Sequence, residues 1–259
     1  LLFNLKLNSM KKNVKTNNLV VLVSGGRSSA MTAFTIHNSP KYKDYNKLYL
    51  FINTSMERSE TFDFLLKIRD VWGIPLRFVE GVYSNEIGVG VKSKEVYFEN
   101  LKMDGSIFSS AIEQVNKITH FGVPNQSTPY CSDYLKKRVT HDFCRNYFGT
   151  TKYIKAIGYR KEDMPKRITL KELKEEPSVI CPLLTDFEVP IGQLELNTFF
   201  NSQPFKLNLH SRLTNCELCW KKSRKNLIEV LQDKPRFIEW VRNEEKKWGN
   251  SFFRDNLTI

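Results

Sequence analysis

Short apolar runs alternate with helical patterns over the first third of the chain. Residues 19–23, 47–52 and 75–79 are apolar runs with the character of buried strands. Between them, residues 28–38 and 60–71 carry apolar side chains at helical spacing. Parallel strands need a crossover connection, so this alternation predicts an α/β protein with a parallel sheet and helices on both faces.

The rest of the chain continues this pattern and then changes. Residues 81–106 are rich in Gly, Ser, Asn and Lys and show no long periodicity, which predicts a mobile loop or excursion near the site. Further helices are expected at 107–117, 132–148, near 190, at 225–233 and 235–248, and strands at 152–157 and 179–184. We therefore expect an α/β domain over 10–185 and a C-terminal helical extension over 186–259.

Positive charge is in clear excess. Forty Lys and Arg residues against 28 Asp and Glu give a net charge of +12. Such an excess favours polyanions, and tRNA or DNA is therefore a candidate partner. The basic residues are scattered, with modest clusters at 136–138 and 221–225, and an ordinary solvated surface explains them as well.

The apolar segments and the cysteines bear on the cellular compartment of the protein. No apolar stretch approaches the length that a bilayer requires, so we expect a cytoplasmic protein without membrane contact. Whether it forms a homo-oligomer stays open. Five cysteines, an odd number, argue against a disulfide framework. Cys216 and Cys219 form a C-x-x-C, a spacing that suits a metal, a cluster or a redox pair.

Candidate chemistry begins directly after the first apolar run. There the chain reads Ser24-Gly25-Gly26-Arg27-Ser28-Ser29 and then enters the first helical pattern. Two glycines allow the backbone to approach a ligand closely. Backbone N–H groups, small hydroxyls and a helix dipole then meet at one point, which suits a phosphate or pyrophosphate. The spacing matches neither the G-x-x-x-x-G-K-[ST] nor the G-x-G-x-x-G loop, and a plain surface turn is the alternative.

Several motifs occur in a telling order. They are Ser24-Gly25-Gly26-x-Ser28-Ser29, Phe51-Ile52-Asn53-Thr54, Pro129-Tyr130-Cys131, Gly158-Tyr159-Arg160 with Arg167, Cys181-Pro182-Leu183 and Cys216-x-x-Cys219. Over residues 18–225, this series resembles the phosphoadenosine phosphosulfate reductase family, within the class of PP-loop adenine nucleotide alpha hydrolases. The resemblance implies a PP-loop domain that binds an adenine nucleotide, either ATP or phosphoadenosine phosphosulfate.

The resemblance also assigns roles to the nucleotide-binding residues. The loop from Ser24 to Ser29, including Gly25, Gly26, Arg27 and Ser28, would hold the pyrophosphate or phosphosulfate. Asn53 and Thr54 would lie near the adenine or ribose. Arg160 and Arg167 match arginines that bind phosphate or sulfate oxygens, for which a planar, permanently charged side chain is suited. A solvated basic loop is the alternative for both arginines.

Three cysteines extend the resemblance to members that carry an iron–sulfur cluster. There, a cysteine pair precedes a C-x-x-C, and Cys131 takes one place of that pair while Tyr130 occupies the other. Cys131, Cys216 and Cys219 would then hold a [4Fe–4S] cluster or zinc. A fourth ligand would come from Cys181, His210 or an exogenous group, and cysteines that bind no metal are the alternative. Thiolates suit iron–sulfur and zinc equally.

Two departures from the family bear on the reaction. Ser28 stands where many PP-loop enzymes have an aspartate that handles Mg²⁺–ATP, which puts ATP pyrophosphatase activity in doubt. No cysteine follows Cys219, whereas the reductases carry a catalytic cysteine in the C-terminal tail. The resemblance thus favours an enzyme of sulfur metabolism or sulfur transfer, either a transferase or an oxidoreductase. An iron–sulfur-dependent enzyme that inserts sulfur into tRNA or DNA, and a non-catalytic nucleotide sensor, stay open.

The remaining reactive and aromatic residues are expected to have packing roles. Cys144 shares a predicted helix face with Tyr147 and Phe148, which indicates a core position. Trp220, Trp240 and Trp248 are expected to pack the C-terminal helices. No Ser–His–Asp order or paired carboxylates single out a catalytic residue.

Overall fold

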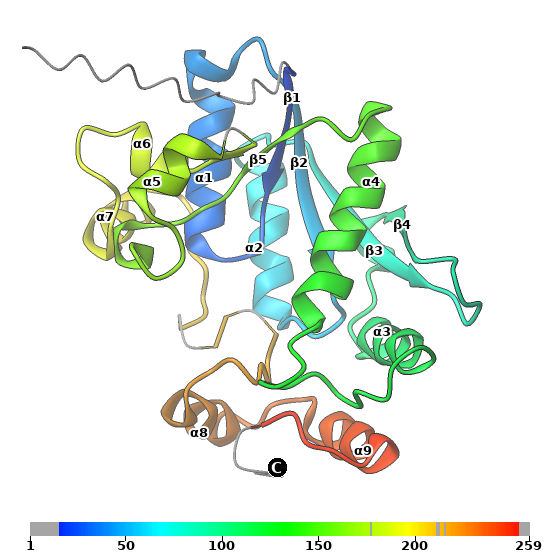
Figure 1. Cartoon of the computed structure of the whole chain (residues 1–259). Helices are drawn as coiled ribbons and strands as arrows, with labels where there is room; N and C mark the ends of the chain where they lie inside the picture. Colours follow the sequence, from blue (N-terminus) through cyan, green and yellow to red (C-terminus); the bar gives the residue numbers. More distant parts are fainter. Residues whose placement is uncertain (1–15, 177, 211–212, 215, 254–259) are drawn as a thin grey trace, which may run out of the picture.

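One sheet organises the fold. The computed structural model describes residues 16–176, 178–210, 213–214 and 216–253, and in these residues six strands pair in the order β4-β3-β2-β1-β5-β6 (Figure 1). All neighbours run parallel except β4, which runs antiparallel to β3. The strands are β1 (Asn18–Leu22), β2 (Asn46–Asn53), β3 (Leu76–Tyr83), β4 (Val91–Val96), β5 (Ile154–Ala156) and β6 (Val179–Ile180).

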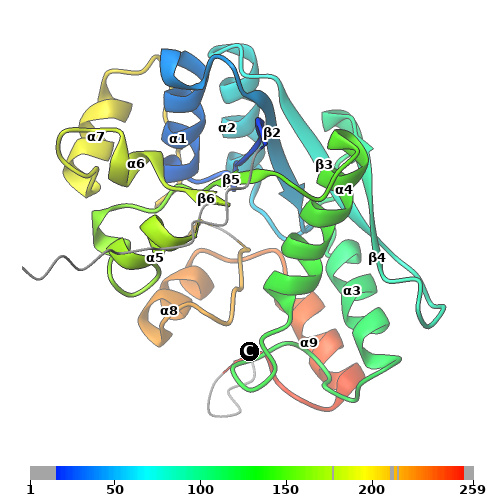
Figure 2. The same ribbon diagram turned by 45° about the horizontal axis from the view of Figure 1, so that its top comes forward.

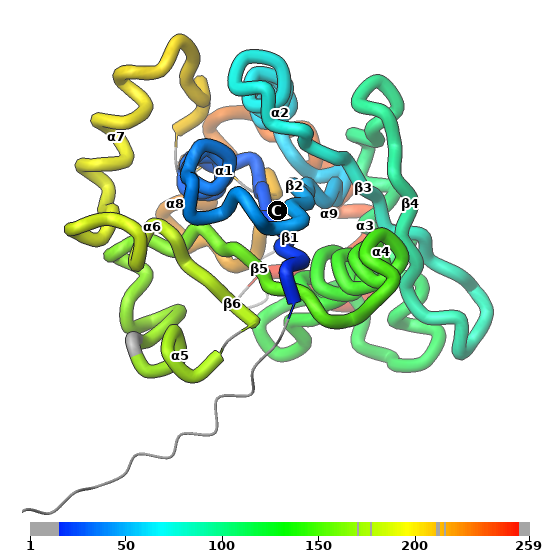
Figure 3. Tube along the Cα trace, turned by 90° about the horizontal axis from the view of Figure 1, so that it is seen from above, coloured from blue at the N-terminus to red at the C-terminus, as the bar shows by residue number. Residues whose placement is uncertain are grey.

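Helices lie on both sides of the sheet when the molecule is seen from above (Figure 3). They are α1 (Arg27–Asn38), α2 (Ser59–Asp70), α3 (Ser106–Asn116), α4 (Arg138–Phe148), α5 (Leu170–Glu175), α6 (Pro182–Thr185), α7 (Gln193–Asn201), α8 (Arg224–Gln232) and α9 (Ile238–Trp248). None of these described helices is long and apolar enough to cross a membrane. The α/β architecture with a mostly parallel sheet and helices on both faces confirms the prediction from the sequence.

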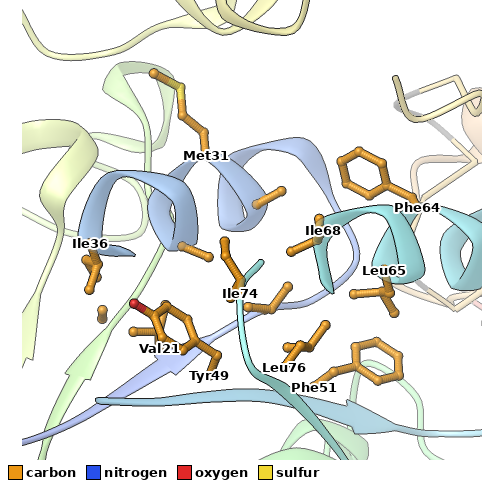
Figure 4. Close-up of a cluster of buried hydrophobic side chains, with 14 of the residues drawn as sticks. Val21, Met31, Ile36, Tyr49, Phe51, Phe64, Leu65, Ile68, Ile74 and Leu76 are labelled. Atoms are coloured by element: carbon orange, nitrogen blue, oxygen red, sulfur yellow. The ribbon is translucent and has the colours of Figure 1, made fainter. Parts of the chain in front are cut away.

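The alternation of side chains along the strands builds two cores. Successive strand residues point to opposite faces, so buried strands feed both layers. On one face, the core joins the strands to α1, α2 and α7 and includes Leu19, Val21, Tyr49, Phe51, Ile68 and Phe200 (Figure 4). On the other face, the core joins the strands to α4 and includes Val20, Leu50, Ile52, Val79, Val139 and Phe143. Cys144 lies in this second core, as expected.

The structure adds detail to two expectations about chain organisation. The segment 81–106 contains the end of β3 and all of β4, an edge strand that the sequence did not predict because its polar residues hide its pairing. The division at 185/186 stays a prediction, and Leu196 and Phe200 of α7 belong to the same core cluster as Leu19. Residues 10–15 and 254–259 of the two expected domains lie outside the described residues.

The last two helices lie at the carboxyl ends of the parallel strands. In Figures 1 and 2, α8 and α9 lie beyond that end of the sheet, and α9 runs beside α3. A third apolar cluster holds them there and includes Met56, Phe108, Trp220, Val230 and Val241. Trp240 and Trp248 pack against it, so the three tryptophans have the packing roles that the sequence predicted. The extension therefore covers the carboxyl ends of the strands, where ligands of parallel sheets bind.

Candidate nucleotide loop and thiol cavity

The loop between β1 and α1 has room for glycine alone at one point. Gly25 has a φ of +77°, a left-handed conformation that L side chains rarely adopt. A Cβ added there would lie 2.3 Å from Cγ2 of Thr61 at the start of α2. The loop therefore packs directly against the segment that follows β2.

Serine hydroxyls fix the shape of the loop. The Oγ of Ser29 accepts a hydrogen bond from the backbone N–H of Ser24 (3.0 Å) and donates one to the carbonyl of Gly26 (2.9 Å). Ser29 is buried and Ser24 is exposed, and the Oγ atoms of the two residues lie 3.1 Å apart, so both hydroxyls contribute to the shape of the loop. No side chain caps α1, and the N–H groups of its first turn have no intrahelical acceptor. That arrangement suits an anion.

The segment that follows β5 lies against the first turn of α1. A Cβ added to Gly158 would lie 2.9 Å from backbone atoms of Ser28 and Ser29. The close approach places the segment that carries Arg160 beside the start of α1. Two of the motifs found far apart in the sequence therefore meet in space.

Two arginines meet beside the loop. Arg27 Nη1 donates to Oδ1 of Asn197 (2.8 Å), and Arg160 Nη1 donates to Oε1 of Gln193. Burial, together with the nearby charge of Arg160, lowers the pKa of Arg27. Gln193 Nε2 in turn donates to Asn197 Oδ1 (2.9 Å), so neutral amides of α7 hold two cations together. No motif or spacing in the sequence pointed to Gln193 or Asn197.

Arg167 lies elsewhere. Its side chain is exposed, forms an ion pair with Asp163 (3.3 Å) and lines the cavity described below. Arg160 approaches the same Asp163 at 4.0 Å. A single carboxylate thus lies between the two arginines that the sequence grouped together.

Asn53 serves the structure. It is fully buried, and its amide donates to Oε1 of Glu80 and to the carbonyl of Lys102, both at 2.8 Å. Its Oδ1 accepts from the backbone N–H of Ser55 (3.0 Å). These bonds use both amide N–H groups and hold the segment after β2 in place. The nucleotide contact expected of Asn53 stays a prediction.

Thr54 connects this segment to the cysteines. Its Oγ1 donates to Oε1 of Glu57 (2.7 Å) and lies 3.5 Å from the Sγ of Cys216. Glu57 is buried and also accepts from the backbone N–H groups of Thr54 and Met56. Since Thr61 packs against Gly25, residues 54–61 border both the phosphate loop and the cysteines.

The three predicted cysteines line one cavity of about 360 Å³, which we call the thiol cavity. Thr54, Arg167 and the side chain of Lys136 line it as well, as do the aromatic residues Phe108, Trp220, Trp240 and Phe252. Burial and the nearby charge of Glu57 raise the pKa of Cys216 to about 12, and Lys136 opposes this shift. Burial disfavours the charge on Lys136, but Cys216 and Glu57 outweigh it and raise the pKa of Lys136.

A π-helical turn sets Lys136 in place. Residues Asp133–Lys137 form this wide turn between Cys131 and α4. Such turns are rare and frequent at functional sites, because the extra residue redirects side chains. The periodicity of 132–148 predicted a regular helix and could not reveal the insertion.

The proposed fourth ligands lie away from this cavity. Cys181 is fully buried in a separate apolar cluster with Ile168 and Leu184, and burial raises its pKa to about 11. His210 is exposed and is not among the residues that line the cavity. Within the described part of the chain, no three His, Cys, Asp or Glu side chains are arranged to hold a metal ion.

The chain is similar to an uncharacterized phage protein. No family of known proteins matches the chain. It is 28% identical over 216 residues to the uncharacterized nin region protein ORF290 of Escherichia phage lambda. The match covers 83% of this chain and 69% of the phage protein. The similarity extends over most of the fold described above, and the phage protein's name states no activity.

Proposed function

We propose that the chain is a PP-loop protein that binds an adenine nucleotide and acts in sulfur metabolism or sulfur transfer, as the resemblance to phosphoadenosine phosphosulfate reductases implies. One observation carries the proposal: residues 54–61 touch the Ser24–Ser29 loop through Thr61 and the thiol cavity through Thr54. A nucleotide phosphate and a set of thiols would therefore share one edge of the sheet. That is the arrangement a sulfur-transferring enzyme needs.

In this proposal, the loop binds the phosphates by its first-turn N–H groups and the hydroxyl of Ser24. Arg27 and Arg160 supply permanent positive charge beside it. Their hydrogen-bond partners, Gln193 and Asn197, are neutral amides, and a charged phosphate or sulfate would be a stronger acceptor. At Arg160 the anion would also compete with Glu162 and Asp163, whose carboxylates lie 3.8 and 4.0 Å away. Arg167 would act at the thiol cavity, where it lies.

Cys131, Cys216 and Cys219 would hold an iron–sulfur cluster. The donor set fits such a group, because three thiols line one cavity with a lysine among them. Thiolates suit iron–sulfur and zinc equally, so the family resemblance, and not the donor set, favours the cluster. When bound through three cysteines, a cluster supplies one iron open to a sulfur ligand.

Nucleotide binding tests the first part. Titration of ATP and of phosphoadenosine phosphosulfate by calorimetry should show binding that weakens about tenfold or more in Arg160→Gln, since a charge-assisted contact contributes about 1.5–3 kcal/mol. Arg145→Gln on α4 is the matched control. It removes the same charge from an exposed side chain whose ion pair with Asp142 is long, at 3.7 Å. Binding of neither nucleotide would refute the proposal, and binding with unchanged nucleotide after incubation would favour a sensor.

Metal analysis tests the second part. Anaerobically prepared protein should contain iron and sulfide, and Cys216→Ser should lose them. Cys144→Ala is the control, because Cys144 lies in the core beside α4 and away from the thiol cavity. Absence of iron, sulfide and zinc from protein with intact cysteines would refute the cluster.

A further inference from the structure

A second cavity, of about 500 Å³, opens between α4 and β5, and we call it the basic groove. It lies on the sheet face that α4 covers over β1, β2 and β3 but leaves open at β5. Leu22 and Ile157 give it an apolar floor, and Tyr153 adds an aromatic ring. None of these residues belongs to the loop or to the thiol cavity.

Positive charge in the basic groove is poorly compensated. Lys136, Lys137, Arg138, His141 and Lys155 line it. Asp133 is the single acid among the lining residues, and it is paired with Arg138 at 2.7 Å. Lys137 and Lys155 form no ion pair with any residue in the described ranges. A concave surface with unpaired cations concentrates anions.

The spread of the basic residues favours a polymer over a small anion. Lys137 ends the π-helical turn, His141 lies one helical turn further along on α4, and Lys155 lies on β5, so these basic residues do not converge on one point. The positive surface also continues, because Lys136 lines both the basic groove and the thiol cavity. Beyond it, Arg167, Lys221 and Lys222 line the thiol cavity.

The thiol cavity has the character of a base-binding pocket. Four aromatic side chains line it, and unstacked bases bind by stacking on such rings. The indole N–H of Trp220 is buried and has no acceptor among the described residues. Buried donors without partners are rare, and a base or another ligand with an acceptor atom would satisfy this one.

We propose that the basic groove binds the sugar–phosphate backbone of a single-stranded nucleic acid, with one nucleotide reaching past Lys136 into the thiol cavity. A duplex keeps its bases stacked, so only a single strand or an extruded nucleotide can place a base in the thiol cavity. The suggestion that the bound strand accepts the transferred sulfur rests on the proposed function. The binding of the strand in the basic groove does not depend on the proposed function.

Fluorescence anisotropy of labelled single-stranded DNA and RNA, measured from low to moderate NaCl, tests the proposal. Lys137→Gln/Lys155→Gln should bind about tenfold more weakly at low salt. Its log K against log[NaCl] slope should be smaller by about 1.4, because each phosphate contact contributes about 0.7 for single strands. Lys43→Gln/Lys67→Gln is the matched control, since it removes the same charge from exposed sites near α1 and on α2.

Four outcomes overturn the proposal: no binding by the unaltered protein at low salt, equal weakening in both double variants, tighter binding of duplex than of single strand, or poly-glutamate binding that matches the oligonucleotide. ATP titration separates it from the proposed function. The groove variant should bind ATP as the unaltered protein does, whereas Gly25→Ala should weaken ATP and leave the oligonucleotide bound. If the unaltered protein binds no ATP, the oligonucleotide result alone decides the groove.

Discussion

Replacing Gly25 by alanine tests whether packing against α2 shapes the phosphate loop. The new methyl group would meet Cγ2 of Thr61 at 2.3 Å, and the φ of +77° disfavours any L side chain. The left-handed conformation costs alanine about 1–2 kcal/mol. The forced methyl contact adds about 1–3 kcal/mol.

Together these effects should lower the melting temperature by roughly 5–15 °C for a chain of this size. Two variants separate the contributions. Gly149→Ala is the matched control, because Gly149 has a φ of +66° but nothing within 4 Å of the added Cβ, so only the backbone cost applies. Thr61→Ser in the Gly25→Ala background removes Cγ2 and leaves the Thr61 Cβ at 3.7 Å, an ordinary contact.

Differential scanning calorimetry of the four proteins measures the effect. We expect Gly25→Ala to melt well below Gly149→Ala, and the added Thr61→Ser to recover most of that difference. If Gly25→Ala costs no more than Gly149→Ala, or if Thr61→Ser recovers nothing, the packing argument is wrong. In that case the loop does not depend on α2.

Three further predictions follow from other contacts. Gly158→Ala should lower the melting temperature, because its Cβ would meet backbone atoms of Ser28 and Ser29, so trimming a side chain should not rescue it. Rescue by Ser28→Ala in the Gly158→Ala background would refute this. Burial opposes the charge on Asp186, but hydrogen bonds from Lys41, Tyr42 and Thr185 outweigh it and lower the pKa of Asp186. A depressed pKa stabilises the fold above pH 3.8 and loses its effect as the pH falls through the folded value, so melting curves of Asp186→Asn and the unaltered protein should differ at pH 7 and converge in acid; a constant difference would contradict it. Burial raises the pKa of Cys144 to about 12 and that of Cys181 to about 11, so iodoacetamide at pH 8 should modify both only after unfolding, as peptide mass spectrometry can show, and rapid labelling of either in the native protein would contradict their burial.

The sequence predicted the parts of the fold that have local signatures. Apolar runs and helical periodicity gave the parallel sheet and most helices, because each buried strand or amphipathic helix carries its own pattern. β4 was missed because an edge strand with Lys92, Lys94 and Glu95 carries no apolar run of its own and is defined by its pairing with β3. The π-helical turn was missed because one inserted residue hardly disturbs a helical pattern.

For the candidate site, the sequence by itself determined which residue types are available: a Ser-Gly-Gly loop after a strand, two arginines after another strand, and three spaced cysteines. Only the tertiary structure decided how they group. It brings Cys131 to Cys216 and Cys219 in one cavity, sets Arg160 and Arg167 on either side of Asp163 with Arg167 lining that cavity, and buries Asn53 behind hydrogen bonds. It also adds Lys136, Gln193 and Asn197. The physical reason is that motif spacing fixes contacts only within a helix, strand or turn, whereas contacts between distant segments depend on how the sheet and its helices pack.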